Sequence, residues 1–531
     1  MPWVNLCALM GFLCFNHLKA QFFEVFDASK MDITGAQMVL VMKLSSFGWS
    51  YQDGQLLISD PKKFNSNLNT YQKSRAVTNH PTFLSFVSYA FFFPALVTGP
   101  AFDYADYEKF IMTDLFEDVP QSKRPGRRRK RKIPRSGRIA AKKVVGGLFW
   151  AALWMVLKPR LNVDMLLSQS FVTDHSFLYR IFFLWILGFV HRLKYYAVWS
   201  IAEGGCILVG IGYNGYDKKK DKFYWNRVQN IDIFAFETGQ NCHACLEAWN
   251  QNTNKWLKNY VYLRTVTKRD PKTGKLRPGF ISTFITFLTS AFWHGTMPGY
   301  YLTFVVGSVL QATGKIYRRN FRPMFITADE SIVSPYKPLY DIVCYLVTQL
   351  AFGYTVQPFV ILEFKKSLQA WSTVYFYIHI GSIITLLVFD GPYKKKVIEL
   401  CAKYHYVAAK IPETPEIPVK PTVVEQIARV PVTRLEKPED GSASVSADEG
   451  SIPDYDDQEE LHDDAVPALG IPELDKFKED FDEFRIEKDL PEWFNEDGSS
   501  KEAMIRAFEE LREDARSMLH NTTSSKPEKK D

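Results

Sequence analysis

Residues 279–314 read GFISTFITFLTSAFWHGTMPGYYLTFVVGSVLQATG and contain no Asp, Glu, Lys or Arg. A helix that crosses a membrane needs about 20 mostly apolar residues, so this segment is long enough for two passes. His294 is the only side chain in it that titrates near neutral pH. Ionisable groups inside a bilayer are costly and are often functional. The alternative is a histidine at a helix end that contacts water or a carbonyl group, and this segment alone does not choose between the two.

Other apolar segments on both sides of this one predict a multi-span membrane protein. Of the 531 residues, 46% are hydrophobic, and these are concentrated before residue 400. We expect about eight to eleven membrane segments, depending on how the short ones are counted. Lys43 follows one short segment and predicts a buried or interfacial helix there. The expected segments cover residues 4–15, 38–42, 82–98, 144–157, 177–190, 195–212, 279–314 (two passes), 338–362 and 370–390.

The polar sequence after the last span predicts a separate tail. We expect a membrane domain over residues 1–404 and a cytosolic, largely disordered tail over 405–531, because prolines and then acidic residues dominate the start of the tail. Apolar residues at helical spacing predict short amphipathic helices near 473–486 and 501–520. These would dock on the core, on a membrane surface or on a protein partner. The first apolar segment lacks the features of a signal peptide.

A run of basic residues lies within 123–143. It fits a cytosolic loop that follows the positive-inside bias of membrane proteins. Attraction to anionic lipid headgroups is compatible with that position. Binding to nucleic acid is disfavoured, because no aromatic residues alternate with the basic ones.

A second polar cluster precedes the uncharged segment. Asn250, Thr253, Asn254 and Leu257 are spaced i, i+3, i+4 and i+7, which predicts one face of a helix. Asparagine is a poor residue for a helix interior, because its side chain competes for backbone hydrogen bonds. Two asparagines on one face suggest that the amides point at a ligand. A solvated or interfacial face, flanked by tryptophans of the aromatic belt, is the structural alternative.

Other chemistries lack their full set of residues. Cys242-His243-Ala244-Cys245 could supply part of a zinc site, but no second pair of ligands lies nearby. No Gly-x-Ser-x-Gly or Walker A sequence is present. An intramembrane histidine and an amide-rich helix remain. His294 can take a proton from an alcohol as a general base, and Asn250 can hold an oxygen. These two roles describe acyl transfer from a thioester to a hydroxyl.

Glu203 is a carboxylate in apolar surroundings, within the expected span at 195–212. It could form an ion pair with Arg192 or Lys194, or it could face a polar cavity. The spacing leaves both interpretations open.

Taken together, these motifs resemble the membrane-bound O-acyltransferase (MBOAT) family, and more narrowly its lysophospholipid acyltransferases of fungal type. Trp293-His294-Gly295, followed by Pro298-Gly299-Tyr300, is similar to the histidine motif of the family, and Trp249-Asn250 with Thr253 and Asn254 is similar to its asparagine motif. The similarity covers roughly residues 10–395. Further matching segments are Lys43 to Trp49 with Asp53-Gly54, Gly99-Pro100 with Asp103 and Asp106, and Ser200 to Asn214.

The resemblance implies an all-α bundle of membrane helices that encloses a substrate tunnel. Acyl-CoA, as co-substrate, would enter from the cytosolic side, and a lysophospholipid would enter from the bilayer. His294 would activate the lipid hydroxyl with help from Asn250, with no metal and no cofactor. The expected location is the endoplasmic reticulum membrane. The candidate substrate-binding residues are Trp293, Thr253, Asn254, Glu203 and Tyr300.

Two features depart from the family pattern. The first helices are short, which suggests an incomplete N-terminus or an alternative start, and an extra polar loop lies at 268–275. Acylation of a sterol, a diacylglycerol or a protein is the alternative within the superfamily, and Asn250 argues against protein acylation. A transporter with His294 as a proton relay is less favoured, because no inverted repeat is evident. A catalytically inactive scaffold whose tail recruits partners is a further alternative.

Overall fold

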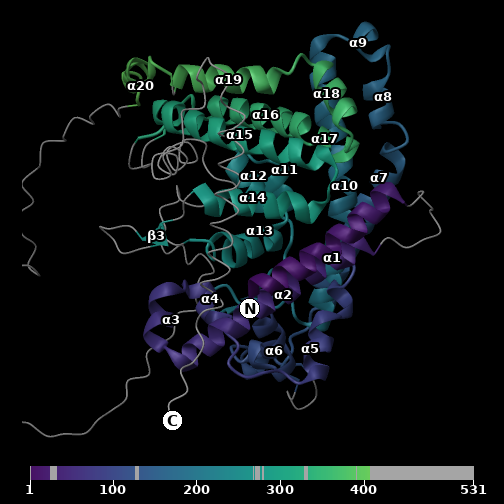
Figure 1. The fold of residues 1–531 in the computed structure, drawn as a ribbon, viewed down its shortest axis with the longest axis vertical. Helices are drawn as coiled ribbons and strands as arrows, with labels where there is room; N and C mark the ends of the chain where they lie inside the picture. Colours follow the sequence, from purple (N-terminus) through teal and green to yellow (C-terminus); the bar gives the residue numbers. More distant parts are fainter. Residues whose placement is uncertain are drawn as a thin grey trace, which may run out of the picture.

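The computed structural model describes residues 2–23, 33–125, 131–266, 268–269, 276–277, 280–327, 333–389 and 391–406. In this part of the chain nearly all regular structure is helical, and the strands form short antiparallel pairs (Figure 1). The predicted all-α fold is therefore confirmed. The expected tail helices near 473–486 and 501–520 and the acidic segment before them lie outside the described residues.

The N-terminal third forms a block of helices around α2, with α1 packed along it and α3, α4, α5 and α6 gathered at one end of the molecule (Figure 1). Lys43 in α2 is fully buried, and its ammonium group donates to the carbonyl oxygens of Tyr89 and Ala90. The prediction of a buried helix at Lys43 is thus confirmed. The elements are α1 (Pro2–Phe22), α2 (Thr34–Ser59), α3 (Pro61–Asn67), α4 (Thr70–Ser74), α5 (Phe83–Ala90), η1 (Phe93–Ala95), α6 (Tyr104–Met112), η2 (Asp114–Phe116) and η3 (Gln121–Lys123).

The central pair of long helices is α7 (Gly137–Leu157) and α10 (Phe177–Val209), joined through α8 (Val163–Leu167) and α9 (Phe171–Asp174). α10 is one continuous helix of 33 residues, so the expected break between spans at 177–190 and 195–212 is wrong. Residues 189–197 contain no proline or glycine that would end a helix. Arg192, in this stretch, pairs with Glu237 from a later element, so its charge stays inside the protein.

The connection between the two halves carries short elements. It contains the hairpin β1 (Tyr216–Asp217) and β2 (Lys222–Phe223), then α11 (Ile233–Glu237), α12 (Cys242–Ala248), α13 (Gln251–Leu257) and the π-helical turn η4 (Lys258–Tyr262). A second antiparallel pair, β3 (Lys268–Arg269) with β4 (Leu276–Arg277), joins the start of the extra polar loop to the two residues that follow it. The tryptophan and tyrosine side chains of α13 and η4 pack into the apolar core with α1, α2 and α14.

The C-terminal half begins with α14 (Phe280–His294) and α15 (Pro298–Phe321), followed by η5 (Arg322–Met324). The charge-free segment is therefore two helices separated by residues 295–297. α15 packs against α16 (Lys337–Thr355) and α19 (Tyr377–Phe389), and Figure 1 shows these helices in layers beyond α14. The remaining elements are α17 (Gln357–Ile361), α18 (Phe364–Ser372) and α20 (Lys394–Ala402).

Several described helices are long and apolar enough to cross a membrane. By length and composition, three segments qualify among the described residues: Gly137–Leu157, Phe177–Val209 and Lys337–Ile361. The bent pair α18 and α19, whose axes differ by 78°, makes a fourth if it is counted as one span. The predicted multi-span membrane protein is confirmed. Among the other predicted segments, α14 with its 15 residues is too short to qualify alone, whereas α15 with its 24 residues is long enough but does not qualify by composition.

Candidate active site

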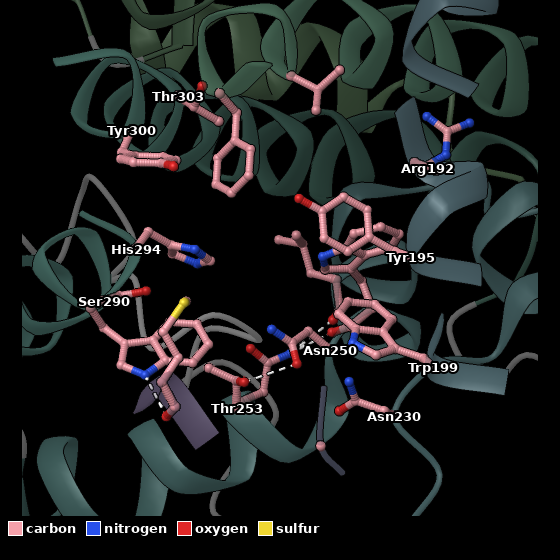
Figure 2. Close-up of a pocket in the computed structure, with 18 of the residues that line it drawn as sticks. Arg192, Tyr195, Trp199, Asn230, Asn250, Thr253, Ser290, His294, Tyr300 and Thr303 are labelled. Atoms are coloured by element: carbon pink, nitrogen blue, oxygen red, sulfur yellow. Dashed lines mark hydrogen bonds between the residues drawn. The ribbon is translucent and has the colours of Figure 1, made fainter. Parts of the chain in front are cut away.

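A mostly apolar cavity of about 400 Å³ lies between the N-terminal block, α10 and the C-terminal helices. Its lining comes from α2, α10 to α17 and the loop at 97–101. Six of the seven residues predicted from sequence line it, and Figure 2 shows His294 and Asn250 reaching into the same space. These six are His294, Asn250, Trp293, Thr253, Asn254 and Tyr300.

His294 is the last residue of α14, so the helix end holds its ring at the cavity. The chain then turns at Gly295, whose φ of +144° is a conformation that side chains disfavour. The imidazole packs among aromatic rings, with centroid distances of 5.2 Å to Phe304 and 5.0 Å to Phe359. Among the described residues no hydrogen bond to the imidazole is found, and the rings of Trp293 and Tyr300 also lie beside it.

The residues on both sides of His294 fix the turn. Trp293 Nε1 donates to the Met38 carbonyl oxygen at 3.0 Å, which ties the end of α14 to α2. Gly299, in the first turn of α15, donates its backbone N–H to the Leu362 carbonyl oxygen at 2.8 Å. A Cβ atom at Gly299 would lie 2.1 Å from the Pro358 carbonyl oxygen, so a larger residue does not fit. Tyr300 follows, and its ring lies 5.9 Å from that of His294.

Asn250 lies just before α13 and not inside a helix. It has a left-handed backbone, with φ +47° and ψ +48°, and takes the N-cap position. The prediction that Asn250 and Asn254 share a helix interior is therefore wrong for Asn250, since asparagine tolerates the left-handed conformation better than most residues. The hydroxyl of Thr253 donates to Asn250 Oδ1 at 2.9 Å. This bond leaves the amide N–H groups of Asn250 to face the cavity.

The side chain of Asn254 supports the site by binding backbone carbonyl groups near Asn250. Its Nδ2 donates to the carbonyl oxygens of Leu246 at 2.9 Å and Trp249 at 3.0 Å. These bonds hold the end of α12 and the residue before Asn250 against α13. Asn254 also lines the cavity, where its Oδ1 is buried without a partner among the described residues.

Glu203 is the one predicted site residue that the cavity does not include. It lies on α10, is 2% exposed, and pairs with Lys143 of α7 at 2.8 Å. Neither of the partners considered from sequence, Arg192 or Lys194, is used. The ion pair joins the two long central helices.

Sequence reasoning missed several polar residues that line the cavity. They come mainly from α10, and their signal was a set of polar and amphipathic side chains spaced one, three and four residues apart within an apolar helix. Figure 2 shows Arg192, Tyr195 and Trp199 on the side of the cavity away from His294. The missed residues are His191, Arg192, Tyr195, Trp199, Asn230, Ser290 and Thr303.

A second cavity, of about 290 Å³, adjoins the first and shares Met42 and Ala101 with it. Its lining is much more polar and includes Asp103, which accepts a hydrogen bond from Tyr71 at 2.7 Å. Burial raises the pKa of the Asp103 carboxyl, and the charge of Arg75 opposes that rise. The cationic residues along this cavity are Arg75, Arg227, Lys255 and Lys258.

The first cavity thus brings the His294 imidazole and the Asn250 amide to one apolar space. The described residues contain no group of three or more His, Cys, Asp or Glu side chains placed to hold a metal ion.

Comparison with known proteins identifies the family of the chain. The model of the MBOAT, membrane-bound O-acyltransferase family, matches residues 18–357, which include Asn250 and His294. The chain is 44% identical over 523 residues to a lysophospholipid acyltransferase of Saccharomyces cerevisiae, covering 97% of this chain and 80% of that protein.

Two further relatives are similarly named. A lysophospholipid acyltransferase of Schizosaccharomyces pombe is 40% identical, over 75% of this chain and 74% of that protein. Human membrane-bound glycerophospholipid O-acyltransferase 2 is 30% identical, over 73% of this chain and 69% of that protein. The chain therefore belongs to the membrane-bound O-acyltransferase family.

Proposed function

We propose that this protein is an acyl-CoA:lysophospholipid O-acyltransferase of the membrane. The observation that supports this most directly is the presence of His294 and Asn250 on one apolar cavity inside the helical bundle. An apolar cavity suits a lipid acceptor and an acyl chain. The names of the fungal relatives point to the same substrates.

In the proposed reaction, His294 accepts the proton of the free glycerol hydroxyl as its oxygen attacks the thioester carbonyl carbon. A C–O bond forms, and the carbonyl oxygen becomes an oxyanion. The Asn250 amide donates to that oxyanion, a role for which the Thr253 bond orients it. The C–S bond then breaks, and the protonated imidazole returns its proton to the CoA sulfur. The products are a diacyl phospholipid and free CoA.

The polar cavity beside the site suits the CoA part of the donor. CoA carries several phosphate charges, and four cationic residues line this cavity. Arg75 and Arg227 pair there with Asp103 and Asp106, and the other two are Lys255 and Lys258. The thioester would then lie near Met42 and Ala101, which border both cavities. We place the enzyme in the endoplasmic reticulum membrane, which co-localisation of a tagged full chain with a marker of that membrane would test.

Labelled acyl-CoA and a panel of lysophospholipids, incubated with microsomes that contain the full chain, test the proposal. We expect label in phospholipid with the wild type and nearly none with His294→Ala. Asn250→Ala should lower turnover by an amount that corresponds to about 2.7–4 kcal/mol, as for one oxyanion donor. The amount of folded protein must be measured for each variant.

His243→Ala is the matched control, because His243 lies on α12 outside the cavity lining and pairs with Glu247. It should keep wild-type activity. Label that appears only in acylated sterol or diacylglycerol, or equal incorporation by His294→Ala and wild type, would overturn the assignment.

A further inference from the structure

α10 presents a polar face to the apolar cavity that the proposed reaction does not use. His191, Arg192 and Tyr195 lie near the middle of this 33-residue helix, and all three line the cavity. Tyr195 comes one turn after the other two, so their side chains share one side of the helix. Polar groups at this depth are costly unless they are paired or bind something.

The Arg192 guanidinium is held firmly on one side. Its Nε and Nη2 donate to the two carboxylate oxygens of Glu237 at 2.8 and 2.9 Å. The Tyr196 hydroxyl bonds to both the guanidinium and the carboxylate. The Arg192 side chain is 5% exposed and that of Glu237 is 23% exposed. This fork-to-fork geometry fixes the orientation of the guanidinium plane.

The same geometry leaves the other side of Arg192 available. Among the described residues, Nη1 has no hydrogen-bond acceptor, and an arginine has five N–H donors to place. His191 Nε2 is also buried without a partner in the described part of the chain. Figure 2 shows the Tyr195 hydroxyl directed into the cavity. One helix therefore presents the Arg192 and Tyr195 donors and a ring nitrogen of His191 to the cavity lining.

Hydrogen-bond donors without partners in an apolar cavity favour an anionic ligand. Because Glu237 neutralises the charge of Arg192, this face offers hydrogen-bond donors with little net charge, which suits a single phosphodiester group. A lysophospholipid carries its phosphodiester only a few bonds from its free hydroxyl. Figure 2 shows this face across the cavity from His294, the proposed base for that hydroxyl.

We propose that Arg192, with His191 and Tyr195, binds the phosphate of the lysophospholipid acceptor, and that Glu237 orients Arg192 for this contact. The inference rests on the proposed function, because it assumes that the acceptor is a lysophospholipid. The α10 face thereby determines specificity for an acceptor with a phosphate, while His294 and Asn250 carry out the transfer.

Steady-state kinetics of the purified full chain separate the two substrates. Arg192→Gln combined with Glu237→Gln removes the guanidinium without leaving a buried charge unpaired. We expect its KM for lysophospholipid to rise about tenfold or more, the effect of losing a hydrogen bond to a charged group. Its KM for acyl-CoA should stay within about twofold of the wild type. Arg192→Lys, which keeps the charge and loses the fork, should raise the same KM by a smaller factor.

The matched control is Arg264→Gln combined with Asp53→Asn. Arg264 and Asp53 form another buried bidentate pair, with side chains 7% and 5% exposed, and neither residue lines either cavity. This control should leave both KM values unchanged. If the Arg192 variants raised the KM for acyl-CoA, either alone or together with the KM for lysophospholipid, the α10 face would serve CoA binding or folding. That result would overturn the proposal. Unchanged KM values in the Arg192 variants would do the same.

Equilibrium binding of a substrate analogue can be measured even for variants that have lost all activity. A labelled single-chain alkyl phosphocholine has the phosphate but no hydroxyl to acylate, so its equilibrium binding reports on the phosphate contact alone. We expect its Kd to rise about tenfold or more in the Arg192 and Glu237 double variant. An unchanged Kd overturns the phosphate contact. Failure of the proposed function looks different, because the wild type would then transfer no label to any lysophospholipid.

Discussion

The amide of Asn250 has a defined direction because one neighbouring hydroxyl fixes it. Thr253 Oγ1 donates to Asn250 Oδ1 at 2.9 Å, so the oxygen of the amide faces the protein and its nitrogen is left for the cavity. An amide nitrogen is a donor and can stabilise an oxyanion, whereas an amide oxygen cannot. The role proposed for Asn250 therefore depends on Thr253.

Thr253→Val tests this dependence. Valine keeps the shape of threonine and removes the hydroxyl, so the Asn250 amide loses the bond that orients it. We expect kcat to fall about two- to tenfold, which corresponds to the net value of one hydrogen bond. Transfer of labelled acyl groups at saturating concentrations of both substrates measures the change.

Thr313→Val is the control for that substitution. Thr313 is also buried in a helix, but its hydroxyl donates to the carbonyl oxygens of Val309 and Leu310 in α15, and it lines neither cavity. Its kcat should match the wild type. If Thr253→Val retained full kcat while Thr313→Val did not, the hydroxyl of Thr253 would have no role in orienting Asn250.

At the scale of the helices, the turn at residues 295–297 between α14 and α15 determines the position of His294. Gly295 has φ +144°, and a Cβ atom there would lie 2.7 Å from Cε2 of Tyr300. Gly295→Ala would force the turn to shift, together with the histidine that precedes it. We expect activity to fall about tenfold or more, because small displacements of a catalytic group have large effects on rate. Acyl transfer per folded protein is the measurement.

Gly381→Ala makes the matched comparison for the turn. Gly381 lies inside α19, where an added Cβ would meet no atom within 4 Å. Alanine there should be neutral or stabilise the protein by up to about 1 kcal/mol. Equal activity of the two alanine variants would show that the conformation of Gly295 does not position His294.

The same elements show which parts of the fold could be predicted from sequence. The break after His294 follows from Gly295 and Pro298, which disfavour a continuous helix. The continuity of α10 does not follow from local sequence, because the partner that neutralises Arg192 is Glu237, 45 residues later. The left-handed backbone of Asn250 was also missed. The backbone carbonyl oxygen of Asn230 accepts a hydrogen bond from the backbone N–H of Gln251 at 2.9 Å. Asn230 lies in a loop 20 residues earlier, and this bond helps to fix the backbone conformation at Asn250.

At the scale of the whole molecule, long-range polar contacts join two N-terminal segments, the motif around residues 43–54 and the start of α4, to the helix and turn that follow Asn250. Trp256 Nε1 donates to Ser45 Oγ at 2.9 Å, and Asn69 Nδ2 donates to Asn259 Oδ1 at 3.1 Å. The sequence contained these residues, but it could not pair them, since they lie about 190 or more positions apart. The same limit explains why Lys143 was not predicted as the partner of Glu203.

The buried pair between Asp53 of α2 and Arg264, just after η4, links these two parts of the chain. Arg264 Nη1 donates to Asp53 Oδ1 at 2.7 Å, and the guanidinium lies over the Trp49 ring, 4.7 Å from its centroid. Asp53→Asn would leave the arginine charge buried without its counterion. We expect a loss of about 3–5 kcal/mol in stability, because breaking one side of a buried pair costs more than the pair contributes. Heating the purified full chain and measuring the fraction that remains soluble tests this.

An exposed ion pair supplies the comparison that makes the result interpretable. Glu363 and Lys366 lie 2.6 Å apart, but their side chains are 53% and 52% exposed. Water and salt screen such a pair, so Glu363→Gln should change stability by only about 0–1 kcal/mol. Asp53→Asn should therefore lower the temperature of half-maximal solubility much more than Glu363→Gln. Similar shifts for both variants would mean that water reaches Arg264, and that the link between α2 and the segment after Asn250 is weaker than its burial indicates.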